Sequence, residues 1–321
     1  VTGLAEAVRV LPRSLAMYRR LVQAARVARP DVAVVIDFPD FNFRLAGALR
    51  RLGVPLVYYI PPQLWAWRSG RMRRLRAIAD RILVIFPFEP EIYRKAGTAA
   101  TFVGHPLLEL ARPTEGRESF LRGLGLDPAA PVVALLPGSR PNEVGAILPT
   151  LVQATPLISA AEPRAQYVVA RAPGLPSSLF PRHPRIAVVE GRADDVLSSC
   201  DLVITASGTA TVQAAIHERP MVVVYRLSPL TYALGRRFVH LDTFAMVNLV
   251  AGEKVVPELI QEAFTPEAVA AEALRLMQDG EARRRALRAV RAVREKLGGP
   301  GASRRAAEAV LEVAHLRSRE R

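Results

Sequence analysis

The chain has 321 residues, 50% of them hydrophobic and 23% charged, a balance that excludes a protein disordered over most of its length. Its 44 Lys and Arg against 30 Asp and Glu give a net charge of +14, which attracts a polyanion, an anionic membrane face or a phosphorylated substrate without deciding among them. Because Cys200 is the one cysteine, an internal disulfide is excluded, and we interpret Cys200 as a packing thiol. No Cys/His cluster has the spacing of a zinc site. No apolar run reaches the length of a transmembrane helix.

Helices and strands alternate over the first hundred residues. The chain begins at Val1, in a helical pattern and without a methionine, which suggests a fragment. Strands are predicted at 31–37, 55–60 and 81–86, and helices at about 42–52, 69–79 and 88–96. This alternation predicts a parallel sheet, and such sheets bind ligands beyond the carboxyl ends of their strands.

A second alternating set follows the passage at 106–130, which is rich in Pro, Arg, Glu and Gly. Its strands are predicted at 132–136, 165–170, 185–189, 201–205 and 220–225, and helices dominate from about 228 to the end. The two sets together predict an α/β fold of two Rossmann-like, doubly wound domains with a cleft between them. The expected domains are 1–122 and 123–321.

Two loops of the second domain are candidate phosphate sites. After the strand 132–136, Gly138 allows close backbone approach, Ser139 can cap the following helix, and Arg140 offers a planar fork of donors. The second loop, 207–211, brings small hydroxyl residues and a glycine to a helix start. Each loop is also explained as an ordinary strand-to-helix turn, but two of them at strand ends suggest a nucleotide diphosphate, although neither matches a Walker or GxGxxG motif.

The first domain offers carboxylates and aromatic residues. Asp37 ends a predicted buried strand and can accept a proton from a bound hydroxyl, whereas Asp40 is equally explained as a helix cap and His105 as a turn residue. The segment 58–76 contains both tryptophans and an arginine-rich run, which fits either a membrane-surface segment or a solvated basic face.

A series of short motifs spread over nearly the whole chain resembles the lipid-A-disaccharide synthase family. In chain order they are Asp37-Phe-Pro-Asp-Phe-Asn, Pro62-Gln-Leu-Trp-Ala-Trp-Arg, Phe86-Pro-Phe-Glu, Gly104-His-Pro, Leu136-Pro-Gly-Ser-Arg, Ala206-Ser-Gly-Thr-Ala-Thr, Met221-Val-Val-Val-Tyr-Arg and Asn248-Leu-Val-Ala-Gly with Glu258-Leu-Ile-Gln. Each motif is weak alone, but their combination in this order is specific.

The resemblance implies a bacterial inverting glycosyltransferase of the two-domain GT-B arrangement, working without a metal or other cofactor. Its substrates would be a UDP-2,3-diacylglucosamine donor and a 2,3-diacylglucosamine 1-phosphate acceptor, and its products UDP and the β-1,6-linked lipid A disaccharide. The resemblance further implies a cytoplasmic enzyme that is peripheral on the anionic inner membrane of a Gram-negative-type bacterium, with no nucleic-acid partner. A homo-oligomer is left open.

The resemblance also assigns roles by position. Asp37 becomes the general base for the acceptor 6-hydroxyl, with Asp40 and His105 as weaker candidates, while Ser139 and Arg140 hold the UDP phosphates. The remaining residues expected near the donor are Ser207, Gly208, Thr209, Thr211, Gln213, Asn248, Glu258 and Gln261. Membrane or acyl-chain contact is expected in 58–76 and 221–247.

Two departures from the family pattern stand out. Gln213 replaces a residue that is often Glu in the family, and the family's first strand with its Gly-Glu-x-Ser-Gly-Asp loop has no counterpart, so an incomplete first domain is expected. Three other hypotheses stay open: another UDP-N-acetylhexosamine transferase or epimerase of the same fold, a non-catalytic UDP-sugar-binding remnant, and a basic nucleic-acid-binding protein, for which 6% aromatic residues give little support.

Overall fold

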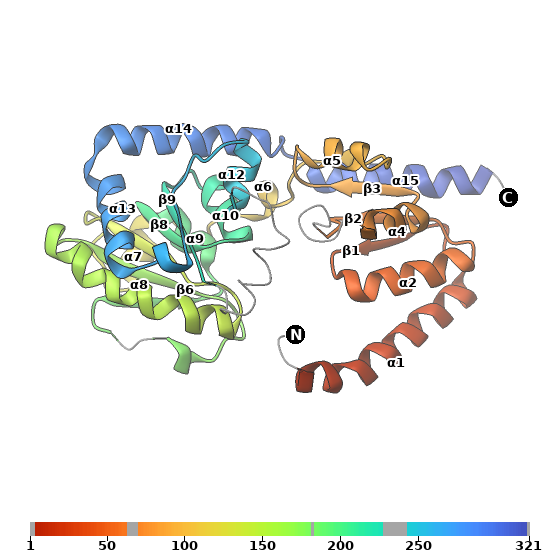
Figure 1. Ribbon diagram of the computed structural model, residues 1–321, viewed down its shortest axis with the longest axis horizontal. Helices are drawn as coiled ribbons and strands as arrows, with labels where there is room; N and C mark the ends of the chain where they lie inside the picture. The colour runs from red at the N-terminus through yellow and green to blue at the C-terminus, as the bar shows by residue number, and fades with distance from the viewer. Residues whose placement is uncertain (1–3, 63–69, 181–182, 227–242, 320–321) are drawn as a thin grey trace. The chain divides into compact units, whose positions relative to one another are not determined.

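The computed structural model describes residues 4–62, 70–180, 183–226 and 243–319. It forms two compact units: unit 1 comprises Val1–Pro106 with Gly298–Arg321, and unit 2 comprises Leu107–Leu297 (Figure 1). This division differs from the expected domains, because the first boundary falls after Pro106 and the C-terminal segment belongs to unit 1.

Unit 1 is built on a four-stranded parallel sheet in the order β1-β2-β3-β4. Its elements are α1 (Leu4–Ala28), β1 (Ala33–Ile36), α2 (Pro39–Arg51), β2 (Leu56–Tyr59), α4 (Gly70–Ile78), β3 (Arg81–Val84), α5 (Glu89–Lys95), β4 (Thr101–Phe102) and α15 (Ala302–Arg319). The three predicted strands are confirmed, but β1 is not the buried strand that was expected, because Val34 and Ile36 are exposed. The strand β4 was not predicted because its two residues form no recognisable apolar pattern.

The sheet of unit 1 is apolar on both faces. Leu56 and Tyr58 of β2 lie in one core with residues of α2 and α4, whereas Val57 packs on the opposite face together with Leu83 of β3. Residues of α15 spaced by three and four cover that second face: Ala306, Ala309 and Val313. The C-terminal helix therefore packs in unit 1 because its apolar stripe matches an otherwise uncovered face of this sheet (Figure 1).

Unit 2 contains a six-stranded parallel sheet in the order β10-β9-β8-β5-β6-β7. Its elements are α6 (Leu107–Leu110), α7 (Arg117–Gly123), β5 (Val132–Leu136), α8 (Pro141–Ala161), β6 (Gln166–Arg171), η1 (Ser177–Leu179), β7 (Ile186–Glu190), α9 (Ala193–Ser199), β8 (Leu202–Ala206), α10 (Thr209–Ile216), β9 (Met221–Tyr225), α12 (Met246–Ala251), β10 (Glu258–Ile260), η2 (Gln261–Ala263), α13 (Pro266–Gln278) and α14 (Gly280–Lys296).

The strand order of unit 2 is that of a doubly wound Rossmann sheet. The chain leaves β5 in one direction for β6 and β7, then returns to the other side of β5 for β8, β9 and β10. The strand order therefore reverses between β5 and β8, where the carboxyl ends of two neighbouring strands leave a crevice for ligands. The two predicted phosphate loops follow these two strands.

The main core of unit 2 lies where α8 and α13 cover the sheet. Within the described residues, α8 is the one helix long and apolar enough by composition to cross a membrane. Ile147, Leu151 and Ile158 of α8 are fully buried in this core, so α8 is a core helix. Cys200 is also fully buried, as expected for a packing thiol, and burial raises its pKa to about 12.

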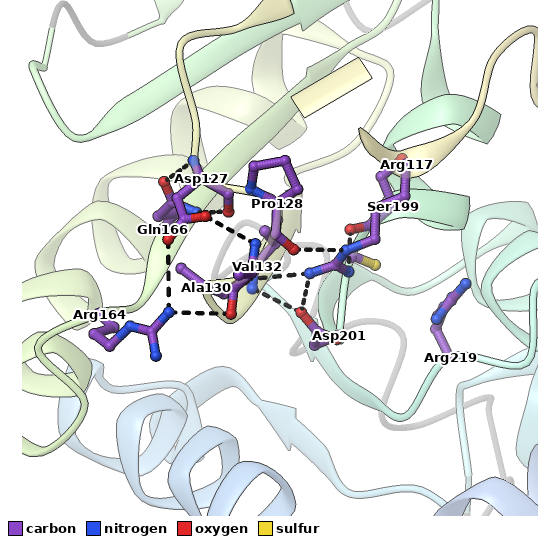
Figure 2. A network of polar contacts seen from close by, with 12 residues as sticks. Arg117, Asp127, Pro128, Ala130, Val132, Arg164, Gln166, Ser199, Asp201 and Arg219 are labelled. Carbon is purple, nitrogen blue, oxygen red and sulfur yellow. Dashed lines mark hydrogen bonds and ion pairs between the residues drawn. The ribbon is translucent and has the colours of Figure 1, made fainter. Parts of the chain in front are cut away.

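A polar network fixes α7 and the starts of β5 and β8 at the edge away from the strand carboxyl ends (Figure 2). The guanidinium of Arg117 donates to the Ser199 carbonyl at 2.6 Å and pairs with Asp201 at 2.9 Å. The same carboxylate of Asp201 accepts from the Val132 amide at 2.9 Å. These bonds explain why α7, expected in the first domain, belongs to unit 2.

Part of the segments expected to contact the membrane or acyl chains lies outside the described residues. These parts are 63–69, which includes Trp65 and Trp67, and 227–242.

Candidate functional site

The carboxyl ends of the central strands of unit 2 surround a cavity of about 550 Å³. Residues of four loops line it: those after β5, β6, β7 and β8. Six of the residues predicted near the donor are among them, namely Ser139, Arg140, Ser207, Gly208, Thr209 and Gln213. The structure thus brings the two predicted phosphate loops into one pocket at the reversal of strand order.

The loop after β5 depends on a glycine. Gly138 has a φ of +115°, and a Cβ there would lie 2.9 Å from the Cβ of Glu143, so a side chain does not fit. The Glu143 carboxylate accepts from the Ser139 amide at 3.2 Å and lies 3.3 Å from Arg140 Nη1. The amide and the guanidinium expected to bind phosphate therefore already hold an anionic group.

The expectation that Ser139 caps α8 is wrong. The helix starts with Pro141 at its first turn, so Arg140 occupies the N-cap with extended backbone and no side-chain cap bond. The Arg140 side chain is 72% exposed, which leaves its guanidinium accessible at the pocket.

The loop after β8 also requires a glycine, because Gly208 has a φ of 136° and a ψ of −155°. Ser207 and Thr209 flank it at the pocket, and Ser207 Oγ donates to the Phe244 carbonyl at 2.8 Å. Thr211 does not reach the pocket: it is fully buried, and its hydroxyl donates to the Gly208 carbonyl at 2.8 Å. Thr211 therefore shapes the start of α10.

Gln213 lines the pocket one helical turn beyond Thr209, with Asp194 beside it. Asp194 Oδ1 lies 3.4 Å from Gln213 Nε2 and 2.9 Å from His217 Nε2. Neither His217 nor Asp194 was predicted from the sequence to belong to a functional site. An acid in the first turn of a helix is explained by the helix dipole alone, so only the fold reveals this cluster.

Three further donor-site candidates lie away from the pocket lining. Asn248 is fully buried and donates to Glu258 at 2.7 Å, and Glu258 also accepts from the amides of Phe244 and Ala245 at 3.0 Å. They hold the segment whose Phe244 carbonyl receives the Ser207 hydroxyl, so they support the pocket loop from behind. Gln261 follows β10 with a φ of 55° and is also absent from the lining.

In unit 1, Asp37 stands at the carboxyl end of β1 with an exposed side chain. Asp37 and Phe38 have φ values of 46° and 39°, an unfavourable conformation for residues other than glycine. The Asp37 carbonyl accepts from Asn42 Nδ2 at 2.7 Å and from Tyr58 Oη at 2.9 Å. Burial, followed by the charge of Asp37, raises the pKa of Tyr58 and keeps it a donor. Strained backbone held from two sides beneath an exposed carboxylate is typical of functional sites.

The weaker catalytic candidates have different surroundings. Asp40 is exposed in the first turn of α2, where an acid complements the helix dipole. His105 is only 3% exposed and packs beside the Phe86 ring, with 5.3 Å between centroids. Burial lowers the pKa of His105 to about 4, so the imidazole is neutral near pH 7.

The fold defines the class of protein first. The UDP-GlcNAc 2-epimerase of Neisseria meningitidis bound to UDP-GlcNAc has a TM-score of 0.66 at 12% identity, covering 93% of this chain and 81% of its own. The spinosyn rhamnosyltransferase SpnG has a TM-score of 0.60 at 17% identity, covering 94% of this chain and 79% of its own. The chain is therefore an α/β protein with two Rossmann-like domains of the GT-B type.

Sequence comparison then identifies the family. The lipid-A-disaccharide synthetase model matches residues 1–313. The lipid-A-disaccharide synthase of Anaeromyxobacter dehalogenans (strain 2CP-C) is 45% identical over 98% of this chain and 83% of the relative, and that of Myxococcus xanthus (strain DK1622) is 43% identical with the same shares. The chain belongs to the lipid-A-disaccharide synthetase family.

Proposed function

We propose that this chain is a hexosyltransferase that joins the sugar of a UDP-2,3-diacylglucosamine donor to the 6-hydroxyl of a 2,3-diacylglucosamine 1-phosphate acceptor. The observation that carries this proposal is the family match over residues 1–313. The pocket supports it independently, since two glycine-dependent loops converge at the reversal of a Rossmann sheet, where nucleotide ligands bind. No observation favours an epimerase, another transferase or a nucleic-acid-binding protein over this reaction.

On the donor side, the diphosphate would replace the Glu143 carboxylate as the partner of the Ser139 amide and the Arg140 guanidinium. The start of α10, at Gly208 and Thr209, would supply further donors to the same phosphates. As the bond between the sugar and UDP breaks, negative charge grows on the departing diphosphate. Arg140 would stabilise that charge more strongly in the transition state than in the bound substrate, and this difference would lower the activation barrier.

On the acceptor side, Asp37 would act as general base. The acceptor 6-oxygen forms a bond to the anomeric carbon of the donor while the bond from that carbon to UDP breaks, and the hydroxyl proton passes to the Asp37 carboxylate. Direct displacement of this kind inverts the anomeric centre. The exposed carboxylate and the clamped backbone of Asp37 support this role.

The setting proposed for the reaction is the cytoplasmic face of an inner membrane. Both substrates carry acyl chains, and a net charge of +14 favours an anionic surface, so we propose peripheral association there.

The experiment that tests the function is direct. The purified chain is incubated with both diacylated substrates, and disaccharide 1-phosphate and UDP are measured by mass spectrometry. Disaccharide formed in equal amount with UDP supports the proposal. Epimerised donor without disaccharide would indicate another reaction, and UDP binding without any product would indicate a non-catalytic remnant.

A further inference from the structure

We infer that Arg305 is a positioning residue that ties together the two chain segments joining unit 1 to unit 2 and thereby restricts the relative movement of the units. The chain passes from one unit to the other after Pro106 and again after Leu297. The inference goes beyond the proposed function, and only its kinetic part rests on it. Transfer would need Asp37 of unit 1 and the pocket of unit 2 at the same time, so restricted movement would serve the reaction.

The Arg305 guanidinium holds both segments by hydrogen bonds to backbone carbonyls. In the segment that leads out of unit 1, the Val103 carbonyl accepts from Nε at 2.8 Å. In the segment that returns, the Pro300 carbonyl accepts from Nη1 at 2.8 Å and the Gly299 carbonyl from Nη2 at 2.9 Å. Hydrogen bonds from a charged donor are strong, and the planar guanidinium fixes all three directions at once. We call this arrangement the junction clasp.

The two segments of the junction clasp also approach each other closely at a glycine. Gly298 has a φ of +91°, and a Cβ there would lie 3.2 Å from Gly104 Cα and 3.4 Å from the ring of Phe102. Both the backbone conformation and the close approach therefore favour glycine at position 298. The next residue differs, because a Cβ at Gly299 would meet no atom within 4 Å. The close approach is thus specific to Gly298.

The stability of the helix does not explain an arginine at this position. Arg305 lies near the start of α15, and the first turn of this helix has no acidic residue. A cation near a helix N-terminus opposes the helix dipole, so the arginine is unfavourable for the helix itself. Bonds to Pro300 and Gly299 alone would only shape the loop that precedes α15. The bond to Val103 lies in the other segment and gives Arg305 its role in joining the two.

Buried residues show how much of the chain the junction clasp holds. Leu297 is fully buried in unit 2, and the next fully buried residue along the chain is Ala302 in unit 1. Residues 298–301 lie between them and comprise three glycines and one proline. Without the clasp, these residues would lengthen the flexible connection between the units. With the clasp, bending is confined to the junctions themselves, as in hinges that absorb domain movement in a few residues.

The test measures the distance between one spin label in each unit by electron paramagnetic resonance. The labels are attached to Ala24→Cys in α1 and Ala271→Cys in α13, both at exposed positions, and the fully buried Cys200 stays unlabelled. The reach of a flexible connection grows with the square root of its length, so Arg305→Gln, which frees 298–301, should widen the distance distribution roughly twofold.

Arg304→Gln is the matched control for this measurement. It removes the same charge from the neighbouring position, where the arginine side chain is 84% exposed and pairs with Glu308 of its own helix. The control should leave the distance distribution unchanged. A distribution for Arg305→Gln no wider than that for Arg304→Gln would overturn the inference, and so would an equally broad distribution in the unmodified chain.

A second variant tests the junction clasp without altering Arg305. Gly298→Ala adds a Cβ where the two segments approach each other and should also widen the distance distribution, whereas Gly299→Ala, with open space around its Cβ, should not. This comparison decides the question if Arg305→Gln fails to fold. Equal distributions for the two glycine variants would then overturn the inference.

Transfer kinetics connect the junction clasp to the reaction. We expect Arg305→Gln to lower kcat about 10- to 100-fold, because misplacing Asp37 relative to the bound donor is costly, while the affinity for UDP, which depends on unit 2, stays constant. A kcat equal to that of Arg304→Gln would overturn the role in transfer. If the unmodified chain forms no disaccharide, the proposed function fails, but the distance measurement needs no substrate and still decides whether the clasp restricts movement.

Discussion

The side chain of Asn42 tests whether the hydrogen bonds to the backbone at Asp37 hold its carboxylate in position. Asn42 is 8% exposed, and its Nδ2 donates to the carbonyls of Ile36 at 2.9 Å and of Asp37 at 2.7 Å. Asn42→Ala removes both bonds from the strained backbone. At about 0.5–1.5 kcal/mol each, their loss should lower the free energy of unfolding by about 1–3 kcal/mol.

The same change should misplace the Asp37 carboxylate, which we propose as the general base. Because small displacements of a catalytic group are costly, we expect kcat to fall about 10- to 100-fold while UDP affinity, which depends on unit 2, stays constant. Urea unfolding and steady-state transfer kinetics measure the two effects. Arg51→Ala, which changes an exposed residue at the other end of the same helix, is the control and should change kcat little. Asn42→Ala protein that is destabilised yet fully active would refute the link between the clamped backbone and catalysis.

Three further changes test other parts of the structure. Arg140→Ala should weaken UDP binding roughly tenfold, the value of a charged hydrogen bond, and should also slow transfer; unchanged UDP affinity by calorimetry would argue against the phosphate role. Asp201→Ala should lower the free energy of unfolding by about 2–4 kcal/mol in urea titrations, because Arg117 and the Val132 amide lose a shared partner. A change in the free energy of unfolding smaller than the error of the urea titration would show that the network is dispensable. His105 has a pKa lowered to about 4 by burial, so the unfolded chain binds more protons between about pH 4 and 6.5, and stability should fall as the pH falls through this window. His105→Gln should flatten that dependence in pH-resolved thermal melts, and an unchanged slope would contradict the assignment.

Apolar patterning predicted the central strands well. The predicted strand 132–136 coincides with β5, and the glycine and hydroxyl residues after β5 and β8 do line one pocket. Both signals are local, because a buried parallel strand is a continuous apolar run and its carboxyl end is a defined place in the fold. The short strands β4 and β10 carry too few residues for such a pattern.

Contacts between residues far apart in the sequence could not be predicted in the same way. The stripe of α15 shows that the helix packs on something, but not that its partner is the sheet of unit 1. The sequence could not show whether a polar residue binds the donor or supports the pocket. Thr211 and Asn248 both donate to backbone carbonyls near the pocket. Asp194 and His217 are 23 residues apart, so only the folded chain makes them neighbours.

The most direct measurement of the central claim compares Asp37→Asn with the unmodified chain in both transfer and UDP binding. Removal of a general base typically costs 10²–10⁴-fold in rate, so disaccharide formation should fall by about that factor while the affinity for UDP stays the same. Rapid transfer by the Asp37→Asn protein would contradict the assignment of Asp37 as the base and with it the proposed mechanism.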